Sequence, residues 1–111
     1  MKKELPYSEE VCMVIIWKRD AVYGKKSTMA DVTNSAHTDY GIDWKWQTVH
    51  TLLNRLIERG FLVSHKDERH TYYTPVKSLN SYRTEKLNAL IKNLYFGDAD
   101  ALQQELSERS E

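Results

Sequence analysis

Residues 46–75 read WQTVHTLLNRLIERGFLVSHKDERHTYYTP, and the spacing of the apolar side chains changes within this stretch. The first half has the period of a helix that buries one face, and Gly60 is a natural stop for a helix. The sequence therefore predicts a helix over Trp46–Arg59 whose buried stripe consists of Val49, Leu52, Leu53 and Leu56.

The second half of the stretch predicts a β-hairpin. Two β-prone runs, Phe61–His65 and His70–Thr74, flank the polar residues 66–69, and Pro75 ends the second run. A helix therefore leads directly into a hairpin.

Two helical patterns precede this unit. Ser8 is placed to cap the first helix, and Gly24 ends it. Thr28 is placed to cap a second, short helix, with Asp31 completing a capping box, and a turn follows at Gly41. The apolar faces of the two helices consist of Val11, Cys12, Ile15 and Ile16, and of Met29, Val32 and Ala36.

From Leu79 onward the period is helical again, interrupted at Gly97, and Asp98 is placed to cap a final helix. A single small core has no room for all the apolar side chains of these helices, so we expect several of them in a two-fold interface. The predicted dimer-interface residues are Leu87, Leu90, Ile91, Leu94, Leu102 and Leu106.

The order of helix, short helix, amphipathic helix and hairpin is that of a winged helix-turn-helix, in which the third helix enters the DNA major groove and the hairpin contacts the neighbouring backbone. We predict a mainly α protein with a small β-hairpin. Residues 1–76 are expected to form the DNA-binding domain, and residues 77–111 a helical dimerisation arm.

The composition fits one soluble domain with a short appendage. The chain has 111 residues, 41% apolar and 29% charged, with a mean hydropathy of −0.66. The longest apolar run, Val11–Trp17, is too short for a membrane span and follows acidic residues, unlike the core of a signal peptide. The single cysteine excludes an internal disulfide. We expect a cytoplasmic protein with no membrane partner.

Charge is unevenly distributed along the chain. Residues 1–43 have a net charge of −1, residues 44–86 of +4 and residues 87–111 of −3. The positive block coincides with the predicted third helix and hairpin, as expected where one face meets a phosphate backbone.

Two motifs and two shorter segments carry a family resemblance. Residues 44–56 have the pattern Trp-x-x-x-Thr-[Ile/Val]-x-Thr-Leu-Leu-x-Arg-Leu, and residues 66–75 the pattern Lys-x-x-Arg-x-x-x-Tyr-x-Pro. With residues 10–17 and 94–98, these segments resemble the penicillinase-repressor (BlaI/MecI/CopY) family. The resemblance implies a homodimeric bacterial repressor that binds a palindromic operator in double-stranded DNA.

Three departures limit what the resemblance implies. The arm is shorter than is usual in the family, and the paired cysteines of the copper-responsive branch are absent. Glu105-Leu106 stands where the antibiotic-responsive branch is cleaved by a membrane-bound sensor protease at an Asn-Phe bond. The inducer and any sensor protein therefore stay unspecified.

A helical wheel places the polar face of the third helix outward. Glutamine can bind the adenine edge, a threonine methyl can contact thymine, and histidine can donate to guanine or phosphate. Lysine and arginine of the hairpin are placed to bind phosphate, as is the start of the second helix. The candidate DNA-binding residues are Thr28, Lys45, Trp46, Gln47, His50, Thr51, Asn54, Arg55, Lys66 and Arg69.

Two other functions stay open. The chain could be a protein-interaction module that keeps the winged-helix scaffold, or a ligand-responsive regulator similar to the MarR or PadR proteins. We predict no catalytic residue and no cofactor, because no phosphate loop, nucleophile motif or catalytic carboxylate pair can be named. We also predict no metal site, because the hairpin residues His65, Asp67, Glu68 and His70 lack the spacing of a metal centre.

Overall fold

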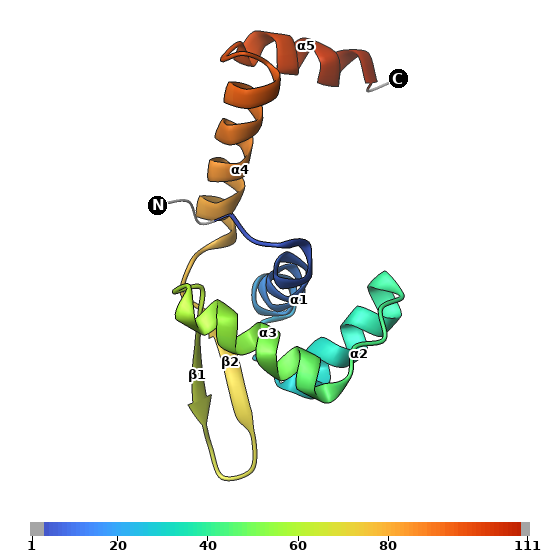
Figure 1. Ribbon diagram of the computed structural model, residues 1–111, viewed down its shortest axis with the longest axis vertical. Coiled ribbons are helices and arrows are strands. Elements are labelled where there is room, and N and C mark those ends of the chain that lie inside the picture. The colour runs from blue at the N-terminus through green and yellow to red at the C-terminus, as the bar shows by residue number, and fades with distance from the viewer. Residues whose placement is uncertain (1–3, 110–111) are drawn as a thin grey trace. The chain divides into compact units, whose positions relative to one another are not determined.

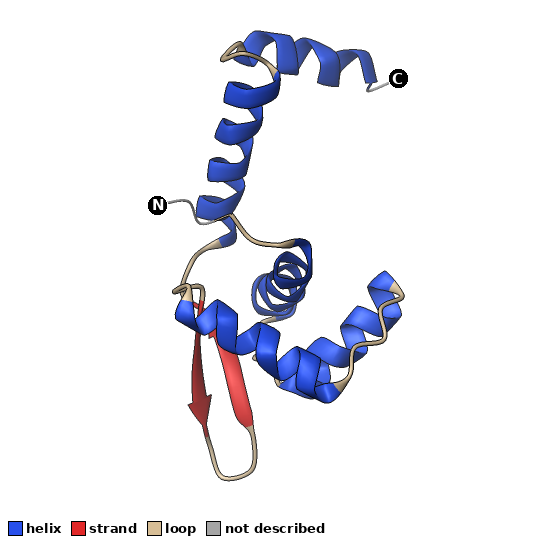
Figure 2. Ribbon diagram, viewed as in Figure 1, coloured by secondary structure: helices blue, strands red, loops and turns tan. Residues whose placement is uncertain are grey.

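The computed structural model describes residues 4–109, which form five helices and one two-stranded sheet (Figures 1 and 2). The first five elements follow the predicted order and confirm the winged helix-turn-helix. In chain order the elements are α1 (Tyr7–Tyr23), α2 (Met29–Tyr40), α3 (Trp46–Glu58), β1 (Leu62–Lys66), β2 (Thr71–Pro75), α4 (Leu79–Leu94) and α5 (Ala99–Arg109).

The chain divides into two compact units after Leu79. The first unit holds α1 to β2, and the second holds α5 and nearly all of α4. The assignment of a DNA-binding domain to residues 1–76 and of a dimerisation arm to 77–111 stays a prediction, and residues 1–3 and 110–111 of those ranges lie outside the described part. No helix among the described residues is long and apolar enough to cross a membrane.

The core of the first unit forms around α1, which packs on α2, α3 and β2. The predicted stripe of α3 is buried in full, and Cys12 is completely buried, as expected for a core residue. Trp17 is also buried, and its indole Nε1 donates to the carbonyl of Lys77 at 2.8 Å.

The prediction that Ser8 caps α1 is wrong. The N-cap is Pro6, whose carbonyl accepts the backbone N–H of Glu10 at 2.9 Å, so Ser8 lies inside the first turn. The Pro6 ring holds φ near the observed −58°, and with ψ at 155° the backbone is extended just before the first helical residue.

The turn between α2 and α3 depends on Gly41. Its φ is +66°, and the backbone N–H groups of Gly41 and Ile42 donate to the carbonyls of His37 and Ala36. This left-handed residue closes α2 and lets α3 begin within a few residues.

Both strands lie one residue later than predicted. The antiparallel register runs from Leu62 opposite Pro75 to Lys66 opposite Thr71. Phe61 is buried and lies just before β1, where its carbonyl accepts the backbone N–H of Val76 at 2.8 Å. Ser27 adds a bridge at the other edge of β2, where its carbonyl accepts the N–H of Tyr73 at 2.8 Å.

Candidate nucleic-acid interface

The exposed face of α3 includes two parallel rows of side chains. Residues four apart lie one turn apart on the same side of a helix. The first row is Trp46, His50 and Asn54, and the second is Gln47, Thr51 and Arg55; all six are exposed. Because the apolar stripe of α3 is buried, all six residues of α3 that are predicted to bind DNA face the solvent.

The first row is joined by side-chain contacts. The indole of Trp46 and the imidazole of His50 stack with their planes 3° apart and their centroids 5.4 Å apart. The amide nitrogen of Asn54 lies 3.5 Å from Nδ1 of His50. The Trp46 side chain is 65% exposed, so this contact covers only part of the indole.

The second row borders a shallow, open groove of about 270 Å³. Gln47, Thr51 and Arg55 line it, together with Thr48 and Leu52. Amide, hydroxyl and guanidinium groups thus lie side by side on the face of α3 that is predicted to meet a major groove.

The start of α3 has no side-chain cap. Lys45 is the N-cap and is exposed, and its side chain makes no capping hydrogen bond. The positive end of the helix dipole and an ammonium group therefore lie together, which favours an anion. In the preceding turn, Asp43 pairs with Nδ1 of His37.

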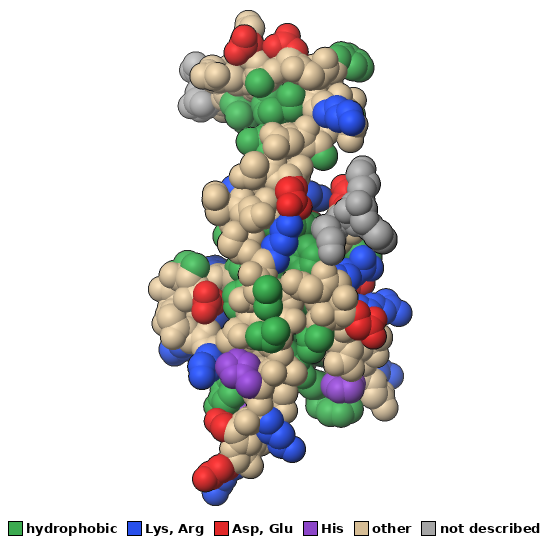
Figure 3. All heavy atoms as spheres, turned by 90° about the vertical axis from the view of Figure 1, so that its left-hand side faces the viewer, with side chains coloured by type: hydrophobic (Ala, Val, Ile, Leu, Met, Phe, Trp, Pro, Cys, Tyr) green, Lys and Arg blue, Asp and Glu red, His purple; other side chains and the backbone are tan. Residues whose placement is uncertain are grey.

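The hairpin tip carries charges of both signs, as Figure 3 shows. Lys66 and Arg69 are exposed there. Oδ1 of Asp67 accepts the backbone N–H groups of His70 and Arg69, each at 3.1 Å, and these bonds lower the pKa of Asp67. That carboxylate therefore shapes the turn that presents the two cations.

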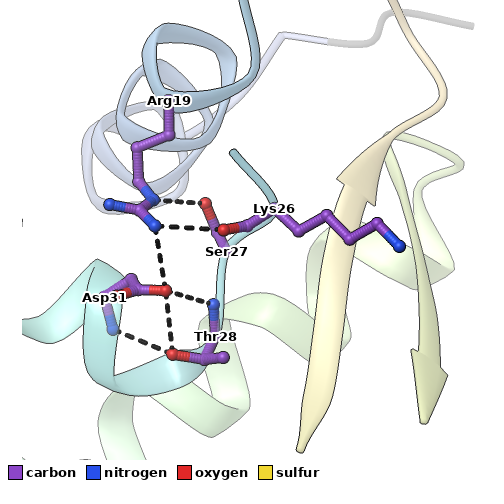
Figure 4. A network of polar contacts seen from close by, with 5 residues as sticks. All are labelled: Arg19, Lys26, Ser27, Thr28 and Asp31. Atoms are coloured by element: carbon purple, nitrogen blue, oxygen red, sulfur yellow. Dashed lines mark hydrogen bonds and ion pairs between the residues drawn. The ribbon is translucent and has the colours of Figure 1, made fainter. Parts of the chain in front are cut away.

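Thr28 is already bonded within the protein (Figure 4). Its N–H and its hydroxyl both donate to Oδ2 of Asp31, and the hydroxyl accepts from the backbone of Asp31, which confirms the predicted capping box. Asp31 also pairs with Arg19 at 3.1 Å. A phosphate contact of Thr28 stays a prediction, although these bonds already use both of its donors.

Lys25 and Lys26 are not among the residues predicted to bind DNA. They line an open hollow of about 590 Å³ between the start of α2 and the hairpin, where Thr28, His70 and Tyr72 also lie. The Lys26 side chain extends toward β2, and its Nζ lies 5.7 Å from the ring centroid of Tyr72 (Figure 4). The Lys-Lys-Ser-Thr string before a helix was the available signal, hidden by the net negative charge of residues 1–43.

The predicted interface residues of the arm differ in exposure. Leu87, Leu90, Leu94 and Leu106 are exposed, with Leu94 at 70%, and Ile91 is half-buried. Leu102 is only 9% exposed within one chain, so it has the least area to offer a partner. Sequence reasoning missed Phe96, which is 91% exposed with a φ of +52°.

Polar contacts stabilise the turn between α4 and α5. The hydroxyl of Tyr95 donates to Oε1 of Glu105 at 2.8 Å, which raises the pKa of Tyr95. Asp98 caps α5 as predicted, since its Oδ1 accepts the N–H of Ala101 at 3.2 Å. Within residues 4–109, no group of three His, Cys, Asp or Glu side chains is placed to hold a metal ion.

Comparisons with known proteins agree with this geometry. The penicillinase repressor family matches residues 6–111. The penicillinase repressor of Bacillus licheniformis is 28% identical over 104 residues, covering 92% of this chain and 76% of that protein. The solution structure of monomeric BlaI from Bacillus licheniformis, in complex with the blaP half-operator, matches with a TM-score of 0.54 and 28% identity; the match covers 73% of this chain and 89% of that one. The chain belongs to the penicillinase repressor family.

Proposed function

We propose that this chain is a sequence-specific, DNA-binding transcriptional repressor that acts in the cytoplasm as a homodimer on a palindromic operator. The observation that carries the proposal is the outward-facing pair of side-chain rows on α3, beside a hairpin with exposed Lys66 and Arg69. Membership of a repressor family, and likeness to a BlaI structure that holds a half-operator, support the same function.

The side chains divide by chemistry into two groups. Gln47, Thr51 and Asn54 can meet base edges, because amide and hydroxyl groups match the hydrogen-bonding patterns of the major groove. Cationic side chains around them can neutralise phosphates and fix the register without reading sequence. The proposed phosphate-binding residues are Lys25, Lys26, Lys45, Arg55, Lys66 and Arg69.

The exposed apolar residues of the arm support the homodimer. Leu87, Leu90 and Leu94 are exposed along α4, and Phe96 follows directly after that helix. An apolar surface of this kind is stabilised when a second copy covers it, and a two-fold pair would place two α3 helices on two half-sites. The function needs no catalytic step and no cofactor.

Binding measurements with two variants test the proposal. Gln47→Ala should weaken the preference at one base-pair position and leave binding to random duplex unchanged. Lys66→Ala should weaken binding to all duplexes alike and reduce the slope of log K against log salt by about one. Lys92→Ala, in α4, is the control with no expected effect on either quantity.

Two results would contradict the proposal. Equal losses on operator and random duplex for Gln47→Ala would remove the base-reading role. No binding to any long duplex at low salt would remove DNA binding altogether and favour a protein-interaction module.

A further inference from the structure

Trp46 places an indole at the first residue of α3, where a helix would enter the groove. Its ring is stacked on that of His50 with the two planes nearly parallel, at an interplanar angle of 3°. The centroid separation of 5.4 Å is that of an offset stack, the favourable arrangement for two aromatic rings. The contact joins two exposed side chains one helical turn apart, so each limits the rotation of the other.

Asn54 approaches the same imidazole along the first row. Its amide Nδ2 lies 3.5 Å from Nδ1 of His50. With Nδ1 facing the Asn54 amide, an Asn54 N–H can donate to it only in the tautomer that carries its proton on Nε2. In that tautomer Nε2 is the ring nitrogen that can donate to a base.

A donor in this position distinguishes between base pairs. In the major groove guanine offers two adjacent acceptors, N7 and O6, whereas adenine offers N7 beside its own amino donor, thymine offers O4 beside its methyl group, and cytosine offers an amino donor. A single N–H donor on α3 therefore favours guanine. The neighbouring second row, with Gln47, has the amide chemistry that suits adenine instead.

We infer that Trp46 is a positioning residue, which by stacking holds His50 with its Nε2–H directed at a guanine of the operator. This inference rests on the proposed function, since it assumes that α3 lies in a major groove. It assigns the guanine preference to the Trp46–His50 pair and not to either side chain alone.

Parallel selections from a random duplex library test the inference. The proteins are wild type, His50→Ala, Trp46→Ala, Trp46→Phe and the double variant of the two alanine changes. Wild type should enrich guanine at one position per half-site, and His50→Ala should lose that preference by about fivefold or more. Trp46→Ala should lose most of it at the same position, and the double variant should lose no more than His50→Ala.

Two controls separate positioning from a general effect. Trp46→Phe keeps an aromatic face and should restore the guanine preference. Tyr23→Ala removes an exposed aromatic ring from α1 and should leave the whole motif unchanged. Thermal unfolding of each variant should stay close to wild type, because Trp46 is mostly exposed.

Three outcomes would overturn the inference. Trp46→Ala could retain the guanine that His50→Ala loses, or it could lose preference at a different base pair, which would make Trp46 a contact in its own right. Unchanged selection by His50→Ala would also overturn it. Failure of wild type to enrich any motif would instead overturn the proposed function, and the inference with it.

Discussion

Arg59, at the end of α3, donates through Nε to Oε1 of Glu9 in α1 at 2.6 Å. The Glu9 side chain is only 2% exposed, whereas that of Arg59 is 37% exposed. A carboxylate buried in the core is thus neutralised by a guanidinium from α3, and the pair joins that helix to the scaffold. Arg59 belongs to the positive block of the sequence, but its charge is directed at the core.

Loss of the Arg59 guanidinium should destabilise the fold. Arg59→Ala leaves the Glu9 carboxylate buried without its guanidinium, and we expect a loss of roughly 1–3 kcal/mol, because partial exposure of Arg59 screens the full cost of an unpaired buried charge. Urea unfolding measures the change. Arg69→Ala, at the exposed hairpin tip, should leave the free energy of unfolding unchanged. Equal stability of Arg59→Ala and wild type would show that the pair contributes nothing.

Cys12 should make stability fall in alkaline solution. Burial and, to a smaller extent, the nearby Glu9 carboxylate together raise the pKa of its thiol from 9.0 to about 12. The folded chain therefore keeps this proton in a pH range where the unfolded chain releases it, so the stabilisation is complete below pH 9 and is lost as pH rises toward 12.

A comparison with Cys12→Ala isolates this effect. The free energy of unfolding of wild type, minus that of the variant, should fall above pH 9 by at most about 1.4 kcal/mol per pH unit. The same burial should keep the native thiol unreactive toward a disulfide reagent until urea unfolds the chain. If the free energies of unfolding of wild type and Cys12→Ala change in parallel above pH 9, the raised pKa of Cys12 is refuted.

Lys26 should contribute to DNA binding independently of sequence. Its ammonium lies beside the Tyr72 ring at the edge of the hollow between α2 and the hairpin. Lys26→Ala should weaken binding to operator and random duplex alike and lower the salt slope by about one. Lys18→Ala, on α1, serves as the matched control. If Lys26→Ala keeps the duplex affinity and the salt slope of wild type, as Lys18→Ala is expected to, the hollow lies away from the DNA backbone.

The dimer should depend on the apolar face of the arm. Leu94→Glu places a charge on a side chain that is 70% exposed in one chain, so it should break an interface without disturbing a core. Light scattering at tens of micromolar should show a dimer for wild type and a monomer for the variant. Val22→Glu, on the similarly exposed Val22 of α1, should remain dimeric. A monomeric wild type would contradict the homodimer.

The sequence predicted those parts of the fold that depend on periodicity. The stripe from Val49 to Leu56 determined both the burial of α3 and the direction of its polar face, because helical geometry leaves no other arrangement. The start of α1 was predicted wrongly because Ser8 and Pro6 are both plausible starts, and only the backbone hydrogen bond from Glu10 decides between them.

Contacts between side chains were beyond the sequence. The stacking of Trp46 on His50 depends on rotamers, and the nearness of Lys26 to Tyr72 depends on how α2 meets the hairpin. The engagement of Thr28 by Asp31 was visible as a capping box, yet its consequence for phosphate binding was not. Composition and period do not show which rotamers bring such side chains together.

Selection of bound duplexes from a random library at about 0.15 M salt, followed by sequencing, tests the central claim most directly. We expect a palindrome whose two half-sites lie about one helical turn apart, since a two-fold dimer presents two α3 helices to one face of the duplex. Enrichment of no motif would contradict a sequence-specific repressor. Enrichment of a single half-site without its inverted copy would contradict the homodimer on a palindromic operator.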